Sequence, residues 1–213
     1  MLYQFKNIPK IALIGQMGAG KDYLAALLGY QRVALSDPIK KIAQLIREGY
    51  ENMAYSILAA QVGGTLALEM VQTVQQMPIE GKKDRKALQY IGETLNVYGI
   101  SPYWLELAMQ KASLFPYVII TDCRRKEEFT YLKDRGFFMI GIQRPEDLRI
   151  KAVMKRDSVK HETVCKSMLD EAEKDIEGLL ERSDLPIYWN IGNEDGQFIK
   201  MLHYENTKRG DHS

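Results

Sequence analysis

Residues that often identify a class of protein at once are scarce in this chain. It has two cysteines and three histidines among 213 residues, and Cys123 and Cys165 have no C-x-x-C or metal-type spacing. We therefore expect reduced thiols, no His/Cys metal centre and a cytoplasmic protein. The formal net charge is only +1, so we expect no general electrostatic attraction for nucleic acids or membranes.

Long apolar stretches are missing as well. No run approaches the roughly 18 residues needed to span a membrane, and residues 1–10 lack the apolar centre of a signal peptide. Hydrophobic residues make up 46% of the chain and charged residues 27%, as in ordinary globular domains. We expect one domain over residues 1–204 and a flexible polar tail over 205–213, and we leave a homodimer open.

The octapeptide GQMGAGKD at residues 15–22 is the most informative segment. It matches the pattern G-x-x-x-x-G-K-[ST] except that Asp22 takes the Ser/Thr position. An apolar run over 10–14 suits a strand before it, and residues 23–28 suit a helix after it. This context predicts a phosphate-binding loop, in which backbone N–H groups and Lys21 face the phosphates of a nucleotide. A chance glycine-rich turn is the alternative.

Asp22 is the unusual position of this loop. A carboxylate is a stronger ligand for Mg²⁺ than the usual hydroxyl, but it brings negative charge close to phosphates. Aspartate is also favoured as a cap at the start of a helix. A metal ligand, a helix cap or both remain open.

Strands alternate with helices along the chain. Apolar runs predict strands at 10–14, 33–36, 117–121, 137–142 and 187–191. Helices are predicted at 37–47, 51–75 with an interruption at Gly63-Gly64, 84–95, 103–113, 125–135, 146–156 and 164–182. The alternation predicts an α/β doubly wound sheet that is parallel and covered on both faces.

Two segments stand apart from this alternation. About 80 residues separate the second and third predicted strands, far more than a crossover needs, which indicates an inserted helical subdomain. Residues 144–160 carry six basic against three acidic side chains. We interpret them as a lid that brings cations to a phosphoryl group, with Arg149 and Arg156 on one helical face. A solvated helix face is the alternative.

Several motifs carry a family likeness. Besides the loop, they are Leu-Ser-Asp-Pro-Ile-Lys at 35–40, Arg-x-x-Leu-Gln-x-x-Gly-Glu-Thr at 85–94, and Val-Ile-Ile-Thr-Asp-x-Arg-x-x-x-Glu at 118–128. With these motifs the chain resembles the P-loop nucleoside monophosphate kinases, most closely the phage-type deoxynucleoside monophosphate kinases. It departs from them at Tyr23, where phage enzymes often have Thr, and at residues 160–163 of the lid.

The resemblance implies a fold and an activity. The fold is a three-layer P-loop NTPase fold with a five-stranded parallel sheet, a helical acceptor-binding insertion over about 40–113 and a lid over about 145–165. The activity is phosphoryl transfer from ATP, with Mg²⁺, to a (deoxy)nucleoside monophosphate, giving the diphosphate. The expected partners are small-molecule nucleotides.

The resemblance also implies roles for individual residues. The catalytic residues are Lys21, Arg124 and Arg156. ATP would contact Gly15, Gly18, Ala19, Gly20, Lys21, Asp22 and Tyr23. The acceptor would contact Lys40, Arg85, Gln89, Trp104, Asp122, Arg124 and Glu128. Asp22 and Asp122 would hold the metal.

Elementary chemistry supports some of these roles. Asp122 follows a predicted strand, and such strand ends line the ligand site of doubly wound sheets. A guanidinium such as that of Arg124 can fork onto phosphate oxygens, and Glu128 lies one helical turn on, where it can orient Arg124. Trp104 could stack on a base, although an indole at a helix start is more often core. Lys40 and Arg85 could equally be exposed helix charges.

Two other functions remain open at this stage. The acceptor could be another small phosphorylated molecule, such as phosphomevalonate or dephospho-CoA. The dephospho-CoA family usually has Asp-x-Asp after its second strand, where this chain has Ser36-Asp37-Pro38. The chain could also be a nucleotide-binding module without transfer activity.

Overall fold

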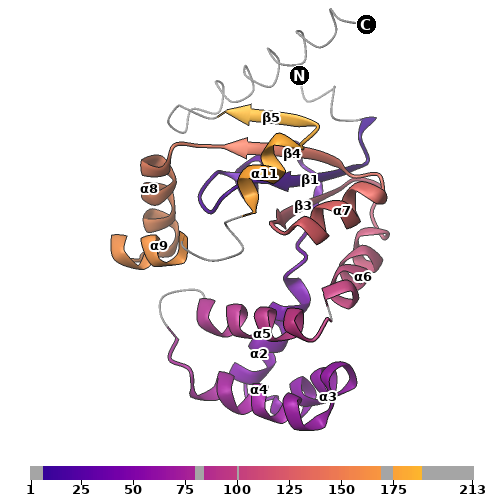
Figure 1. The fold of residues 1–213 in the computed structure, drawn as a ribbon, viewed down its shortest axis with the longest axis vertical. Helices are drawn as coiled ribbons and strands as arrows, with labels where there is room; N and C mark the ends of the chain where they lie inside the picture. Colours follow the sequence, from indigo (N-terminus) through magenta and orange to yellow (C-terminus); the bar gives the residue numbers. More distant parts are fainter. Residues whose placement is uncertain (1–6, 80–83, 100, 169–174, 189–213) are drawn as a thin grey trace, which may run out of the picture. The chain divides into compact units, whose positions relative to one another are not determined.

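The computed structural model describes residues 7–79, 84–99, 101–168 and 175–188 (Figure 1). Within it the chain forms two compact units. One, which we call the helical unit, is Val33–Leu114, and the other, the sheet unit, comprises the chain before and after it. Each unit is described by itself.

The sheet unit is built on five strands. They are β1 (Lys10–Ile14), β2 (Gln31–Val33), β3 (Val118–Cys123), β4 (Phe138–Gln143) and β5 (Leu185–Tyr188), in the order β2-β3-β1-β4-β5. The strands run parallel, with Ile11 opposite both Ile119 and Phe138. The predicted α/β class with a five-stranded parallel sheet is therefore confirmed.

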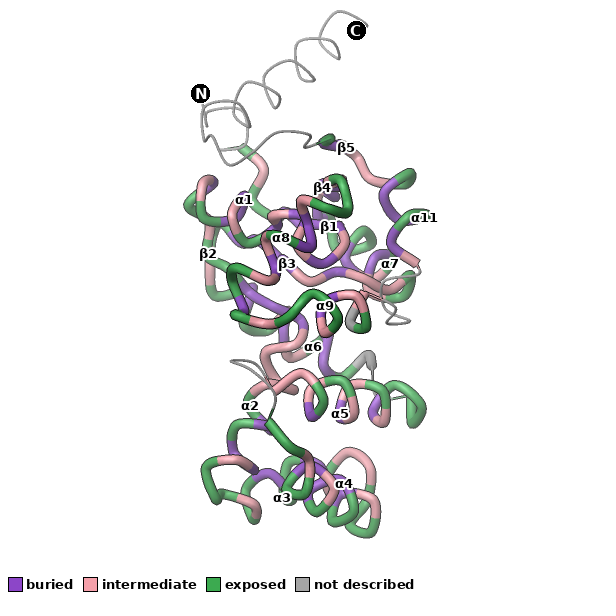
Figure 2. The backbone as a smooth tube through the Cα atoms, turned by 90° about the vertical axis from the view of Figure 1, so that its left-hand side faces the viewer, coloured by how far each residue is buried: buried purple, intermediate pink, exposed green. Residues whose placement is uncertain are grey.

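Helices cover both faces of this sheet. The helices of the sheet unit are α1 (Lys21–Leu28), α7 (Lys126–Asp134), α8 (Glu146–Asp157), α9 (His161–Met168) and α11 (Ile176–Glu181). On one face Leu24 and Leu28 of α1 pack in a core with Ile140 and Ile142 of β4. Side chains alternate along a strand, so Gly141 points to the other face, where a Cβ would meet Leu180 of α11 at 3.0 Å. Burial on both sides explains the continuous apolar runs (Figure 2).

Four of the five predicted strands differ in their bounds from those of the structure, the third and fourth by only one or two residues and the second and fifth by more. The second was predicted at 33–36, but β2 ends at Val33 because an aspartate turn follows it. The Ala34 amide donates to Asp37 Oδ2 at 3.4 Å, and the Asp37 amide donates to the Ala34 carbonyl at 3.1 Å. The fifth begins at Leu185 and contains Pro186, which is tolerated because β5 is an edge strand. The predicted residues 189–191 lie outside the described residues.

The helical unit contains five helices among its described residues. They are α2 (Asp37–Arg47), α3 (Glu51–Val62), α4 (Gly64–Gln76), α5 (Arg85–Val97) and α6 (Ser101–Ala112). α2 has the predicted bounds. Gly63, with φ of 84°, separates α3 from α4 as its interruption of the helical pattern predicted. Their apolar faces share one core, which includes Ile42, Leu58, Met70 and Ile91.

The predicted helix over 164–182 is not continuous. The structure has α9 at His161–Met168 and α11 at Ile176–Glu181, and residues 169–174 lie outside the described residues. α9 packs beside α8, where Val164 contacts a small apolar cluster with Val153 (Figure 1). Within the part of the chain that is described, no helix is both long and apolar enough to cross a bilayer.

Candidate functional site

The phosphate-loop sequence connects β1 to α1 in the predicted way. The loop starts at Gly15, directly after β1, and α1 begins at Lys21. Gly18 and Gly20 have φ of 80° and 100°, a left-handed backbone that side chains with a Cβ rarely adopt. A Cβ would also clash at Gly15, 2.6 Å from the Ile142 carbonyl. The loop therefore depends on glycine for its conformation and for its close contact with β4.

Lys21 is held by the loop itself. Its side chain is buried, with 8% of its surface exposed, and its Nζ donates to the carbonyls of Gly15 and Gln16, the latter at 3.0 Å. Main-chain oxygens thus position a single buried ammonium group at the N-terminus of α1. A buried positive charge at this point favours a multiply charged anion such as a polyphosphate.

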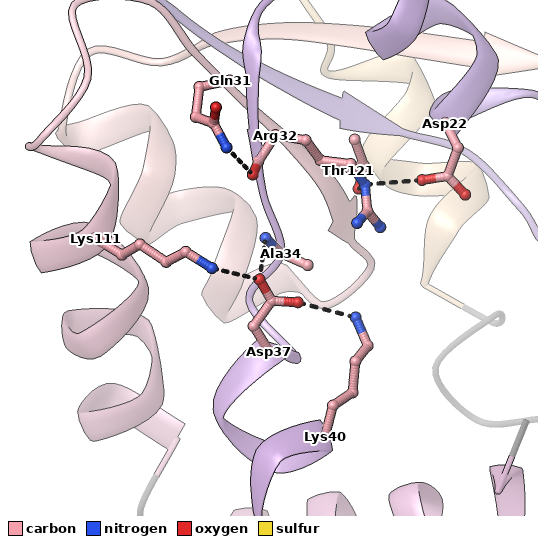
Figure 3. A network of polar contacts seen from close by, with 8 residues as sticks. All are labelled: Asp22, Gln31, Arg32, Ala34, Asp37, Lys40, Lys111 and Thr121. Atoms are coloured by element: carbon pink, nitrogen blue, oxygen red, sulfur yellow. Dashed lines mark hydrogen bonds and ion pairs between the residues drawn. The ribbon is translucent and has the colours of Figure 1, made fainter. Parts of the chain in front are cut away.

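Asp22, the last residue of the loop, is bound by an arginine that was not among the predicted site residues. Arg32 of β2 donates from Nε to Asp22 Oδ1 at 3.1 Å and to Thr121 Oγ1 of β3 at 2.9 Å (Figure 3). Asp22 and Arg32 remain half-exposed. The sequence missed this contact because the second strand was placed at 33–36, which left Arg32 outside it.

The chain following β3 is held by Glu128. Glu128 Oε2 accepts from the backbone N–H groups of Arg124 at 2.8 Å and Arg125 at 3.1 Å. Its burial, together with the negative charge of Asp122, raises its pKa to about 7 although these N–H groups act in the opposite direction. Cys123 packs in the core, and its burial raises the pKa of the thiol.

The hydrogen bonds at Glu128 refine its predicted role. We expected the carboxylate to orient Arg124 through a side-chain pair. The hydrogen bonds above instead position the main chain from which Arg124 and Arg125 project. Asp122 itself is partly buried at the carboxyl end of β3.

Two arginines anchor α8 to the phosphate loop. Arg149 is buried, with its Nε bonded to the Arg144 carbonyl at 3.1 Å and its Nη1 bonded to the Met17 carbonyl at 3.4 Å. Arg144 donates from Nη1 to the Gly18 carbonyl at 3.3 Å. Arg149 therefore uses its guanidinium to join α8 to the loop through the Met17 carbonyl.

Arg156, predicted as the catalytic cation of the lid, is half-exposed. It makes a bidentate contact with the buried carboxylate of Asp157, at 2.8 and 2.9 Å. This contact, with a further contribution from the charge of Asp22, raises the pKa of the Arg156 guanidinium. A Cβ at Gly18 would lie 3.0 Å from Val153 Cγ2, so α8 packs closely against the phosphate loop.

The helical unit has its own charged site. Lys40 and Lys111 donate to the two oxygens of Asp37, each at 3.1 Å (Figure 3). Burial of Asp37 favours its neutral form, but the two lysines outweigh this effect and lower its pKa. These residues line a pocket of about 430 Å³ between α2 and α6, together with Ala34, Pro38, Lys41, Gln44, Leu107 and Ala108. Three lysines and one aspartate give this pocket, which we call the lysine pocket, a net positive charge that favours an anion.

The remaining predicted acceptor residues lie elsewhere in the helical unit. Arg85 is the first residue of α5, and the Gln89 amide donates to Glu93 Oε1 at 3.0 Å. Trp104 is 5% exposed and packs in the core of the unit, with its ring edge-to-face with Tyr103. In this conformation Trp104 offers little ring surface to a base, because core packing covers it.

The remaining loop residues and the metal ligands complete the predicted set. Ala19 is buried, and Tyr23 packs its ring against the core of the sheet unit. Over the described ranges, no three acidic, histidine or cysteine side chains gather around one point. Mg²⁺ itself usually takes only one or two carboxylates and completes its shell with waters and phosphate oxygens.

Comparisons with known proteins relate the chain to others by fold. No family model and no curated protein matches it. Among solved structures, TT1252 from Thermus thermophilus has a TM-score of 0.55 and 21% identity, and the match covers 95% of this chain and 98% of that one. This similarity supports the α/β fold.

Two further solved structures match more weakly. Shikimate kinase from Acinetobacter baumannii has a TM-score of 0.45 and 16% identity over 98% of both chains. Dephospho-CoA kinase from Campylobacter jejuni has a TM-score of 0.41 and 18% identity, over 94% of this chain and 98% of that one. At these scores the two matches carry no conclusion about this chain.

Proposed function

We propose that the chain is an ATP-dependent phosphotransferase that acts on a small phosphorylated acceptor, a (deoxy)nucleoside monophosphate, and forms the diphosphate. The observation that carries the proposal is the phosphate loop. Gly18 and Gly20 take left-handed conformations, and Lys21 is buried against loop carbonyls at the start of α1. This combination concentrates positive potential where a nucleotide polyphosphate would bind.

Phosphoryl transfer depends mainly on positioning and charge neutralisation. Lys21 would neutralise the β- and γ-phosphates, while Asp22 and Asp122 would hold Mg²⁺, which neutralises further charge on the phosphates when bound. Arg156 would add a guanidinium from the end of α8. Its bond to Asp157 keeps the group pre-oriented.

A phosphorylated acceptor is favoured by the basic side chains of both units. Arg124 projects from a main chain that Glu128 holds by two hydrogen bonds. In the helical unit, Lys40 and Lys111 line a pocket and share one aspartate, which leaves net positive charge for a phosphate dianion. The nucleotide character of the acceptor rests on the resemblance of segments 35–40, 85–94 and 118–128 to the phage-type kinases.

The test is an ADP-release assay with purified protein, ATP and Mg²⁺ against a panel of acceptors. The panel contains the common deoxynucleoside and nucleoside monophosphates, with phosphomevalonate and dephospho-CoA as alternatives. We expect at least one nucleotide to raise turnover well above the rate with ATP alone, and Lys21→Met to abolish the increase. Lys151→Met removes a lysine from the exposed face of α8 and is the matched control.

Each other result of the assay would point to a different function. Turnover with phosphomevalonate or dephospho-CoA alone would contradict the nucleotide acceptor but keep the transferase. ATP binding without turnover on any acceptor would favour a nucleotide-binding module. Arg124→Ala then tests the acceptor site, because it should raise the acceptor KM without changing the affinity for ATP.

A further inference from the structure

Arg32 joins three elements at the edge of the phosphate loop. It comes from β2, its partner Asp22 belongs to the first turn of α1, and its partner Thr121 belongs to β3. Nothing in the loop motif requires an arginine at this point. The contact arises because β2 and β3 are neighbours at one end of the sheet.

The geometry of the guanidinium leaves most of its hydrogen-bonding capacity available. Both contacts use Nε, which is shared between Asp22 at 3.1 Å and Thr121 at 2.9 Å. The two terminal nitrogens carry four further N–H donors. Figure 3 shows them directed away from the Asp22 contact, and the Arg32 side chain is 46% exposed.

The charges around Asp22 also favour a phosphate beside Arg32. Its carboxylate pairs with Arg32, while Arg156 is paired with Asp157. Because these pairs are neutral, Lys21 leaves net positive charge in the first turn of α1. A planar fork of donors with net positive charge suits phosphate oxygens better than an isolated ammonium does.

We propose that Arg32 is a phosphate ligand of the nucleotide site, held at Nε by Asp22 and Thr121 so that its terminal nitrogens bind phosphate oxygens. This proposal deepens the proposed function and rests on its phosphate site. The phosphate belongs to the ATP donor or to the acceptor, and the experiment separates these two sources. In either case Asp22 binds Nε and not the terminal nitrogens, but its negative charge opposes a phosphate at the same guanidinium.

The opposite charges of Arg32 and Asp22 give a test in which the two mutations change ATP affinity in opposite directions. ATP binding is measured by calorimetry in EDTA, so that no metal contributes, on wild-type protein and on Arg32→Ala, Arg32→Lys and Asp22→Asn. Arg32→Ala should weaken ATP binding about 10- to 100-fold, the effect of losing charged hydrogen bonds. Arg32→Lys should recover only part of this loss, because an ammonium cannot fork. Asp22→Asn should leave binding equal or tighter, because the amide oxygen can still accept from Nε while the opposing negative charge is removed.

Controls separate this role from a structural one. Gln31→Ala changes the neighbouring exposed residue on β2, whose amide donates to the Arg32 carbonyl, and should leave ATP binding unchanged. Thermal unfolding of each variant measures folding independently. A purely structural ion pair would make Arg32→Ala and Asp22→Asn lower the melting temperature and weaken ATP binding together, which would overturn the proposal. If Arg32→Ala does not fold, the comparison of Arg32→Lys with Asp22→Asn decides the question.

The remaining outcomes distinguish this inference from the proposed function. If Arg32→Ala leaves ATP binding intact but raises the acceptor KM by a similar factor, the phosphate belongs to the acceptor. If wild-type protein binds ATP through Arg32 but no acceptor supports turnover, the proposed function fails and the ligand role of Arg32 stands. If Arg32 substitutions alter neither ATP binding nor acceptor KM, the inference is wrong whatever the enzyme does.

Discussion

The phosphate loop of the sheet unit and the lysine pocket of the helical unit hold their cations in different ways. Lys21 is buried and donates to main-chain carbonyls of its own loop. Lys40 and Lys111 are half-exposed and donate to a single carboxylate, Asp37. A cation bound by backbone keeps its place as long as the loop keeps its shape, whereas a cation bound by a side chain can exchange partners. The first arrangement suits a site of constant geometry and the second a site that adapts to its ligand.

Removal of Lys21 should give the largest effect. Lys21→Met is expected to lower kcat/KM for ATP by roughly 10²- to 10³-fold, the usual consequence of losing a charge that stabilises the transition state. Lys21→Arg should not rescue it, because a planar guanidinium cannot reproduce the hydrogen bonds of a compact ammonium group to the two loop carbonyls. Steady-state kinetics measure both variants. Normal ATP kinetics in Lys21→Met would show that the backbone-held lysine matters no more than the lysines held by Asp37.

The conformation of the phosphate loop can be disturbed by a substitution that leaves its charge unchanged. Gly18→Ala combines a left-handed φ of 80° with a Cβ 2.6 Å from the Arg149 carbonyl, and should cost roughly 2–4 kcal/mol of unfolding free energy. Gly29→Ala is the control, since it has φ of 67° but no atom within 4 Å, and should cost only about 1 kcal/mol. Urea unfolding compares them, and equal losses would show that the contact with Arg149 contributes nothing.

The carboxyl group of Glu128 accepts hydrogen bonds from the backbone, so it extends the comparison from basic to acidic side chains. Its pKa of about 7 in the folded chain exceeds the ordinary value of 4.5, so folding favours its protonated form. Its contribution to stability is therefore fully present below pH 4.5 and is lost as the pH rises through 7.

Glu128→Gln should remove this dependence, because the neutral amide keeps an oxygen to accept from the Arg124 and Arg125 amides. Relative to wild type, the variant should gain stability between pH 4.5 and 8, by up to about 3 kcal/mol. Urea unfolding across this range measures it, with Glu127→Gln on the exposed face of α7 as control. A stability difference independent of pH would contradict the raised pKa.

The lysine pocket should give the smallest effects. Lys40→Met and Lys111→Met are each expected to raise the acceptor KM about 3- to 10-fold with little change in kcat, because solvent screens half-exposed charges. Asp37→Asn should lower the acceptor KM, because it releases both lysines. Lys86→Met, on the exposed side of α5, controls for net charge. If Asp37→Asn raised KM instead, the aspartate would be positioning the lysines for the ligand and would not be competing with it.

Several elements could be predicted from sequence because their signals are local. The Asp-Pro start of α2, the glycine break at Gly63 and the apolar strands needed only neighbouring residues to be read correctly. The bounds of β2 and β5 could not be predicted, since a turn at Asp37 ends the first and an edge position admits Pro186 into the second. The bounds of these two strands depend on the order of the strands in the sheet.

The candidate site likewise has features that follow from local sequence and features that follow from the tertiary structure. The eight residues of GQMGAGKD by themselves determined the conformation of the loop, because glycine conformations, the lysine and the helix start are properties of consecutive residues. Only the tertiary structure decided that Arg32 meets Thr121, 89 residues away, and that Arg149 binds Met17, 132 residues away. It also decided that burial raises the pKa of Glu128. Such contacts follow from strand order and from helix packing on the sheet, which distant parts of the chain set together and which no single segment encodes.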